Sequence, residues 1–254
     1  MKRLIVNADD LGRAHGINAG VLRAHREGIV TAATLMANAH AAAEAGRLAR
    51  ETPSLDVGVH LTLSYGRPLA EPRLIPSLVE PDGAFPRGPD AFRGTGRASR
   101  DETLVEYRAQ YLHAVELIGR APTHLDTHHW LHDEPALEWA ITALASETGA
   151  AVRPHDGAQR DRLRAAGVRT VDAYVRDFQH EGHVGITTLE RILATIADGI
   201  VELGCHPGEA DAELSATSSY AALRPTELAT LTDARTHATV ARQRIVLSTY
   251  ADLP

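Results

Sequence analysis

The sequence predicts an α/β fold: a single-domain, distorted (β/α) barrel that is TIM-barrel-like and carries a long inserted loop. Short apolar runs alternate with longer stretches of helical spacing, and about eight of the short runs occur. A doubly wound open sheet is the alternative, but no glycine-rich phosphate loop follows the first run. The chain has 254 residues, enough for a substantial core, so residues 1–254 are expected to form one domain.

Each expected element has a local signal. The first strand is the apolar run Leu4-Ile5-Val6, the first helix stops at Gly28, and Pro53 closes the alanine-rich second helix. Strands are expected at residues 4–6, 32–36, 56–63, 124–129, 150–153, 170–174, 199–206 and 245–248. Helices are expected at residues 15–28, 41–51, 101–119, 135–148, 160–166, 188–197 and, as one or two helices, 226–243.

Residues 64–100 interrupt this alternation. The segment is proline-rich, contains three aromatic side chains and is too long for an ordinary connection. Long loops of this kind are commonly lids or binding loops, so we expect it to lie over the active rim of the barrel. The alternative is a surface excursion with no role in the site.

Composition narrows the classes of partner. The formal net charge of -7 and the lack of a dense Lys/Arg run argue against nucleic-acid binding. The one cysteine, Cys205, excludes an intrachain disulfide and a four-cysteine zinc site. No apolar run approaches the roughly 20 residues of a membrane span. The N-terminus enters a strand without a cleavable signal pattern, so a cytoplasmic location is expected.

Two adjacent carboxylates, Asp9 and Asp10, stand where the first strand is expected to end, and Gly12 marks a turn. Neighbours in a regular strand point to opposite faces, but at a frayed strand end both could turn into one cleft. Two acids there repel each other unless a cation or a proton relieves them. One acid could bind a divalent metal while the other acts as a base. The alternative is that Asp9 caps a turn and Asp10 is solvated.

A polar cluster occupies the fourth expected strand, residues 124–129. Spacing of two places His124, Asp126 and His128 on one face of that strand and His129 on the other. Burying so many polar groups without a task is costly, which favours a functional role. The spacing alone does not choose between His124 and His128 as a ligand.

Three further candidates lie at or near expected strand ends, and such ends share one rim in a parallel barrel. His60 falls late in the third strand, and His206 ends the seventh. A carboxylate and two imidazoles would hold a metal with positions open for water and substrate, as metal-assisted hydrolysis requires. A core position for His60 and a turn role for His206 are the alternatives. Arg153 either pairs with Asp9 or lies on the surface, and it is the only obvious arginine at the rim.

At these residues the sequence resembles the YdjC-like carbohydrate deacetylase family, which includes chito-oligosaccharide deacetylases and a hopanoid-biosynthesis member. The resemblance covers nearly the whole chain and is specific because the motifs occur together and in order. The motifs are Asn7-Ala8-Asp9-Asp10-Leu11-Gly12, residues 28–38, Gly58-Val59-His60-Leu61-Thr62-Leu63, Pro122-Thr123-His124-Leu125-Asp126-Thr127-His128-His129 and Cys205-His206-Pro207.

The resemblance implies a distorted (β/α) barrel, hydrolysis of an N-acetyl group on a sugar, and a divalent metal, Mg²⁺, with Zn²⁺ or another transition metal as the alternative. By position it implies Asp10, His60 and His128 as metal ligands. Asp9 would be the general base and His206 the acid or oxyanion partner. Where related sequences often have a third histidine after His128-His129, this chain has Trp130, whose ring could stack on a sugar.

The expected function is therefore metal-dependent hydrolysis of an N-acetylated amino sugar or glycoconjugate, with a small-molecule or oligosaccharide substrate. A phosphodiesterase ranks lower because phosphate substrates often call for a basic clamp. A non-catalytic, sugar-binding regulatory module would have lost the base or a ligand, and neither is missing. A homodimer is left open.

Overall fold

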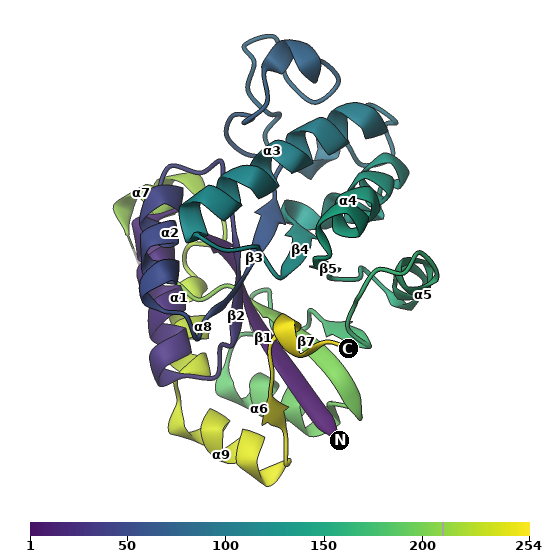
Figure 1. The fold of residues 1–254 in the computed structure, drawn as a ribbon. Coiled ribbons are helices and arrows are strands. Elements are labelled where there is room, and N and C mark those ends of the chain that lie inside the picture. The colour runs from purple at the N-terminus through teal and green to yellow at the C-terminus, as the bar shows by residue number, and fades with distance from the viewer. Residues whose placement is uncertain (210) are drawn as a thin grey trace.

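The computed structural model describes residues 1–209 and 211–254. A curled, all-parallel sheet forms the centre, and helices pack around its outside (Figure 1). Seven strands follow the order β5-β4-β3-β2-β1-β7-β6, and β8 pairs with β1. The strands are β1 (Lys2–Leu11), β2 (Ala32–Leu35), β3 (Asp56–Leu61), β4 (His124–Thr127), β5 (Ala151–Val152), β6 (Ala173–Val175), β7 (Gly199–Cys205) and β8 (Val246–Leu247).

The helices follow the strands in nearly the expected alternation. They are α1 (His15–Glu27), α2 (Ala42–Glu51), α3 (Arg100–Ile118), α4 (Pro135–Thr148), α5 (Gly157–Ala165), α6 (Ile186–Thr195), α7 (Ala212–Thr217), α8 (Arg224–Leu231) and α9 (Ala234–Arg242). The short helix α7 has no counterpart among the expected elements. None of the helices in the described ranges is both long enough and apolar enough to cross a lipid bilayer.

The barrel is distorted because its sheet does not close. β5 and β6 stand at the two ends of the strand order and do not pair with each other in the described chain. A non-strand segment lies beside β5 instead, where the N–H of Val152 donates to the carbonyl of Arg169 at 2.9 Å. The expected α/β, barrel-like fold class is confirmed, and the observed form is a curled sheet open at one side.

Strands β1 and β3 are almost wholly buried, because helices cover the outside of the parallel sheet and side chains fill its concave side. Packing is close enough to require glycine at one position of β3. A Cβ on Gly58 would lie 2.4 Å from the carbonyl oxygen of His124 on β4, a distance that backbone atoms do not tolerate.

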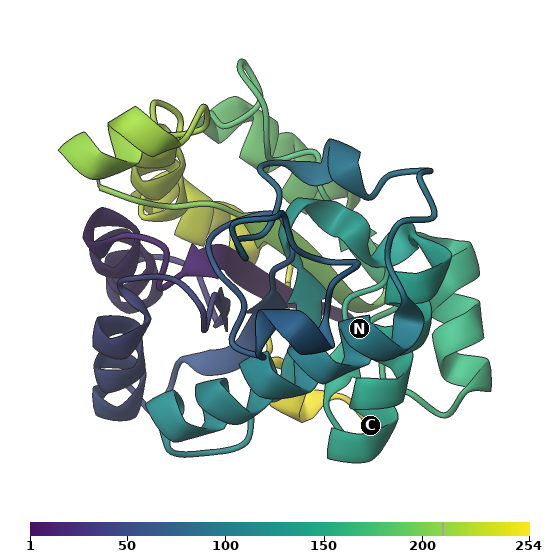
Figure 2. The ribbon, with the colours of Figure 1, turned by 90° about the horizontal axis from the view of Figure 1, so that it is seen from above.

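The long segment, residues 64–99, is fastened to α3. Glu106 accepts backbone N–H groups of Leu69 and Ala70 at 3.1 and 2.8 Å, and Glu102 accepts that of Ser77 at 2.7 Å. Gln110 bonds both Glu106 and the backbone of Thr62. In the view from above, the segment lies over the middle of the sheet (Figure 2).

Candidate active site

A cavity of about 800 Å³ opens at the carboxyl ends of the strands. Its lining comes from β1, β3 and the segment after β4, from the long segment, and from the loops around α7. The long segment contributes Ser64, Tyr65, Gly66, Arg87, Gly88, Pro89 and Arg93. The expectation that this segment lies over the active rim therefore agrees with its position, whereas its role as a lid stays a prediction.

Asp9 and Asp10 both line this cavity although they are neighbours in β1. Asp10 has a positive φ of 69°, and the register with β2 shifts between Ala8 and Leu11. This irregularity breaks the alternation that would send the two side chains to opposite faces. The sequence predicts the acids at a frayed end of the strand. The strand in fact continues to Leu11, and the irregularity inside it has the same effect.

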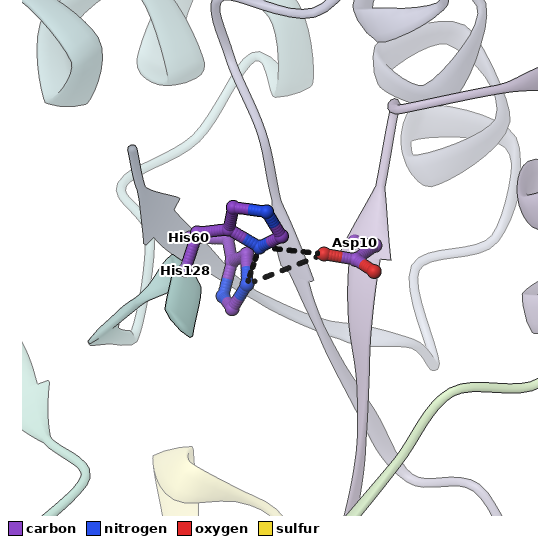
Figure 3. Close-up of side chains that lie close together, drawn as sticks. All are labelled: Asp10, His60 and His128. Carbon is purple, nitrogen blue, oxygen red and sulfur yellow. Dashed lines mark hydrogen bonds and ion pairs between the residues drawn. The ribbon is translucent and has the colours of Figure 1, made fainter. Parts of the chain in front are cut away.

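Asp10, His60 and His128 line this cavity, and their side chains point toward one another (Figure 3). Oδ1 of Asp10 lies 3.1 Å from Nδ1 of His128 and 3.4 Å from Nε2 of His60, and the two nitrogens are 3.3 Å apart. All three side chains are buried, and their ligand atoms lie within 4.8 Å of one another. One carboxylate oxygen and two imidazole nitrogens therefore face a common point, as a mononuclear metal site requires.

Neighbouring residues fix the orientation of this cluster. Nδ1 of His60 donates to Oδ1 of Asp126 at 2.7 Å, which turns Nε2 toward Asp10. Burial opposes a charge on His60, but Asp126 and Asp10 outweigh it and raise the pKa of His60 to about 10. Arg224 donates to Oδ2 of Asp10. Burial would raise the pKa of Asp10, but Arg224 and His128 hold it well below its usual range.

Asp9 has a different environment from its neighbour. The guanidinium of Arg153 donates two hydrogen bonds to its carboxylate, from Nη1 to Oδ2 at 2.8 Å and from Nη2 to Oδ1 at 2.7 Å. Burial would raise the pKa of Asp9, but Arg153 lowers it below its usual range, so the carboxylate is ionised at neutral pH. The same guanidinium bonds Glu202 on β7 at 2.7 Å and Asp126 at 2.7 Å.

His206 lies just beyond β7, beside Asp9. Its Nε2 is 3.8 Å from Oδ2 of Asp9, and it lines the same cavity. Burial lowers the pKa of His206 to about 4. The five site residues named from the sequence thus lie together around one cavity.

The residues of the fourth expected strand, 124–129, do not all belong to a strand in the structure. β4 ends at Thr127, so His128 and His129 lie in the turn after the strand and do not alternate across it. His124 is in the interior, where its Nε2 is 2.9 Å from the side-chain oxygen of Asn7 and its ring stacks on Tyr250. His124 therefore does not line the cavity. Asp126 does not line it either, but it accepts a hydrogen bond from Nδ1 of His60, which does.

Arg153 is not a rim residue, and the expectation that it is the only rim arginine is wrong. Its side chain is fully buried, because its three acidic partners point into the interior. Four other arginines line the cavity: Arg13, Arg87, Arg93 and Arg224. All four lie in loops or at the start of a helix, outside the motifs quoted above, so the sequence did not reveal them.

Sequence reasoning also missed Glu202 and Glu227. Glu202 could have been predicted to matter, because it is the one charged residue in the apolar run Ile200-Val201-Glu202-Leu203, and a buried acid needs a cationic partner. Glu227 could not have been predicted, because it belongs to no motif and lies on a helix of mixed polar and apolar composition.

Residues 3–242 match the family described as YdjC-like protein. The chain belongs to this family. A carbohydrate deacetylase of Geobacillus stearothermophilus is 39% identical over 98% of this chain and 96% of that protein. A chitooligosaccharide deacetylase of Serratia marcescens is 34% identical over 99% of each chain.

A solved structure shares the fold of this YdjC-like chain closely. It is a protein of Enterococcus faecalis whose proposed role is cellobiose-phosphate cleavage, with a TM-score of 0.90, 29% identity and 98% coverage of both chains. The family expected from the motifs is therefore confirmed, and the fold agrees with that of a solved relative.

Proposed function

We propose that this protein is a metal-dependent carbohydrate deacetylase that hydrolyses the N-acetyl group of an amino sugar or glycoconjugate and releases acetate. The observation that carries the proposal is the pairing of a buried Asp10–His60–His128 cluster with a separate, ionised Asp9 in one cavity. The names of the relatives from Geobacillus stearothermophilus and Serratia marcescens support the class of reaction.

The cluster fits a divalent metal. Oδ1 of Asp10 is buried and accepts no well-aligned hydrogen bond from the described residues, although two imidazole nitrogens face it. Asp10, His60 and His128 would hold the ion, which supplies a Lewis acid and an acidified water. Two nitrogens and one oxygen are typical of Zn²⁺-like ions, whereas Mg²⁺ prefers oxygen ligands, so a transition metal is the better match than the Mg²⁺ expected from the resemblance.

Asp9 and His206 would move the protons. Asp9 is charged and is not one of the three proposed ligands, although its carboxylate also lies within 4.8 Å of a nitrogen of His60, so it can take a proton from the attacking water. His206, whose Nε2 lies 3.8 Å from Oδ2 of Asp9, can stabilise the carbonyl oxygen as a neutral N–H donor, or take up a proton and pass it to the amine that leaves. Arg153 keeps Asp9 ionised and fixes its direction.

The cavity supports a sugar substrate. Its volume suits a small ligand. Trp130 is half-buried at its edge, with the Arg176 guanidinium 4.7 Å from the centre of its ring and Tyr174 packed against it edge-on. A rigid, partly exposed indole of this kind can stack on the apolar face of a sugar ring.

A metal-dependent phosphodiesterase is the second candidate. The four cavity arginines favour it, since they remove the reason for which the sequence ranked it lower. The same arginines also fit a sugar that carries an anionic group, and the relatives favour the deacetylase.

The test is to incubate metal-stripped protein with a panel of N-acetylated mono- and oligosaccharides, with Zn²⁺, Mg²⁺, Co²⁺ or no metal, and to measure released acetate. A parallel series with a phosphodiester such as bis(p-nitrophenyl) phosphate measures the alternative. We expect acetate release that needs a transition metal. Phosphodiester cleavage without acetate release would overturn the proposal. Sugar binding without either reaction would favour a regulatory module.

A further inference from the structure

His206 lies between two buried acids. Its Nε2 faces Oδ2 of Asp9 at 3.8 Å, and its Nδ1 faces Oε1 of Glu227 at 3.9 Å. Nδ1 is buried and has no hydrogen-bond partner among the residues that the structure describes. A shift of about 1 Å in the ring would bring Nδ1 to hydrogen-bond distance from Glu227.

Glu227 lies on the first turns of α8 and is fully buried. Each of its two oxygens accepts a hydrogen bond: the backbone N–H of His206 donates to Oε2 at 2.5 Å, and the hydroxyl of Tyr220 donates to Oε1. The ring of Tyr220 packs against the imidazole, with centroids 5.1 Å apart. Glu227 and Tyr220 therefore control both the backbone and one edge of His206.

We infer that Glu227 is a positioning residue for His206, which holds the Nδ1 edge of the imidazole so that Nε2 faces Asp9 and the reacting amide. The inference rests on the proposed function. An imidazole that transfers a proton through Nε2 needs a partner at Nδ1 that fixes its tautomer and offsets its charge. In the described chain no other carboxylate lies within ion-pair distance of Nδ1 of His206.

Charged groups from three elements act on this pair. Asp9 and Asp10 from β1 and Arg224 from α8 influence the charge of the imidazole, and His60 from β3 has a smaller effect. Burial raises the pKa of Glu227 to about 7, while Arg224 and the bonds from His206 and Tyr220 oppose the rise. Glu227 therefore changes charge near neutral pH, well above the range in which Asp9 is protonated.

The test compares Glu227→Gln with Glu227→Asp and Tyr220→Phe. Asp56→Asn is the matched control, because Asp56 is a buried acid with a pKa raised by burial at the far end of β3. We expect Glu227→Gln to lower kcat for acetate release about 10–100-fold with KM little changed, as for lost support of an active-site histidine. Wild-type kcat should fall as pH drops through about 7, and the glutamine variant should lose that step. Glu227→Asp should recover part of the rate.

A second readout does not depend on turnover. Selective ¹⁵N-histidine NMR, with the His206 signal assigned from a His206→Gln variant, reports the tautomer of the ring. We expect that signal to move in Glu227→Gln and Tyr220→Phe and to stay in place in Asp56→Asn. An unmoved His206 signal, or a kcat equal to that of the control, overturns the inference. If the wild-type protein releases no acetate, the proposed function fails, and the NMR comparison still decides whether Glu227 positions His206. Should the glutamine variant not fold, Tyr220→Phe carries the test.

Discussion

Replacing Arg153 with leucine tests how the interior tolerates its acids. The guanidinium makes contacts of 2.6–2.8 Å to Asp9, Asp126 and Glu202, and the exposed fractions of all four residues are at most 1%. Arg153→Leu leaves three buried carboxylates without their cation. Breaking one buried ion pair costs about 3–5 kcal/mol. With three partners we expect the upper end, about 5 kcal/mol, a large share of the roughly 5–15 kcal/mol that stabilises a typical domain.

The assay is urea unfolding at pH 7 and pH 5, with wild-type protein beside the variant. Without Arg153, the pKa values of the buried acids rise in the folded state. The penalty is therefore present above those raised values and shrinks as pH falls through them. In the wild-type protein the folded pKa of Asp9 is lowered, so its favourable contribution is still present at pH 5 and is lost only in stronger acid. The stability deficit of Arg153→Leu should be smaller at pH 5 than at pH 7.

Two further variants calibrate this experiment. Arg153→Lys keeps the charge but loses the forked geometry, so its deficit should be about 2 kcal/mol. Arg162→Leu removes a half-exposed arginine that pairs with Glu138 on the surface, and it should cost less than about 1 kcal/mol. A deficit for Arg153→Leu no larger than that of Arg162→Leu, or one that is equal at both pH values, would refute the reasoning.

Three other predictions concern the site and its support. Asp10→Asn should lose bound metal and activity together, whereas Asp9→Asn should keep the metal and slow acetate release by about 10²–10⁴-fold, as measured by metal analysis and steady-state kinetics; the reverse pattern would exchange their roles. Trp130→Ala should raise KM for an N-acetylated sugar more than it lowers kcat, and unchanged KM would remove the stacking role. Gly58→Ala should destabilise the fold by about 1–3 kcal/mol in thermal or urea unfolding, because its Cβ would press on the backbone of His124; an unchanged midpoint would contradict the close approach.

Much of the fold was accessible from local pattern. Residues 15–28 have helical spacing with a glycine stop signal, residues 135–148 are predicted as a helix, and the structure forms α1 and α4 there. Agreement is weaker where strands are short: residues 170–174 were expected as a strand, but pairing begins only at Ala173. The opening between β5 and β6 is a tertiary property that no local pattern encodes.

The site was accessible only in part. Asp9 and Asp10 attract attention because adjacent acids at a strand end need an explanation, and the histidines follow from their supply and placement. The choice of His128 over His124 came from the resemblance. Alternation along the strand could not make that choice, because β4 ends at Thr127, one residue before His128. Arg224 could not be found at all: it reaches Asp10 across 214 residues of sequence, and no periodicity links positions that only the completed fold brings together.

The attachment of the long segment to α3 has a consequence for protein engineering. Glu102, Glu106 and Gln110 follow one another at four-residue intervals along one side of the helix, and the two acids bind backbone N–H groups rather than particular side chains. These contacts to α3 therefore depend on the backbone path of the segment and not on which side chains it carries at Leu69, Ala70 and Ser77. A replacement segment of the same path that keeps Tyr65, whose ring packs edge-on against that of His128, could change the wall of the cavity while leaving Asp9 and Asp10 in place. Residues 64–99 are thus a segment that could be exchanged between relatives, because α3 holds it mainly by its backbone at these points.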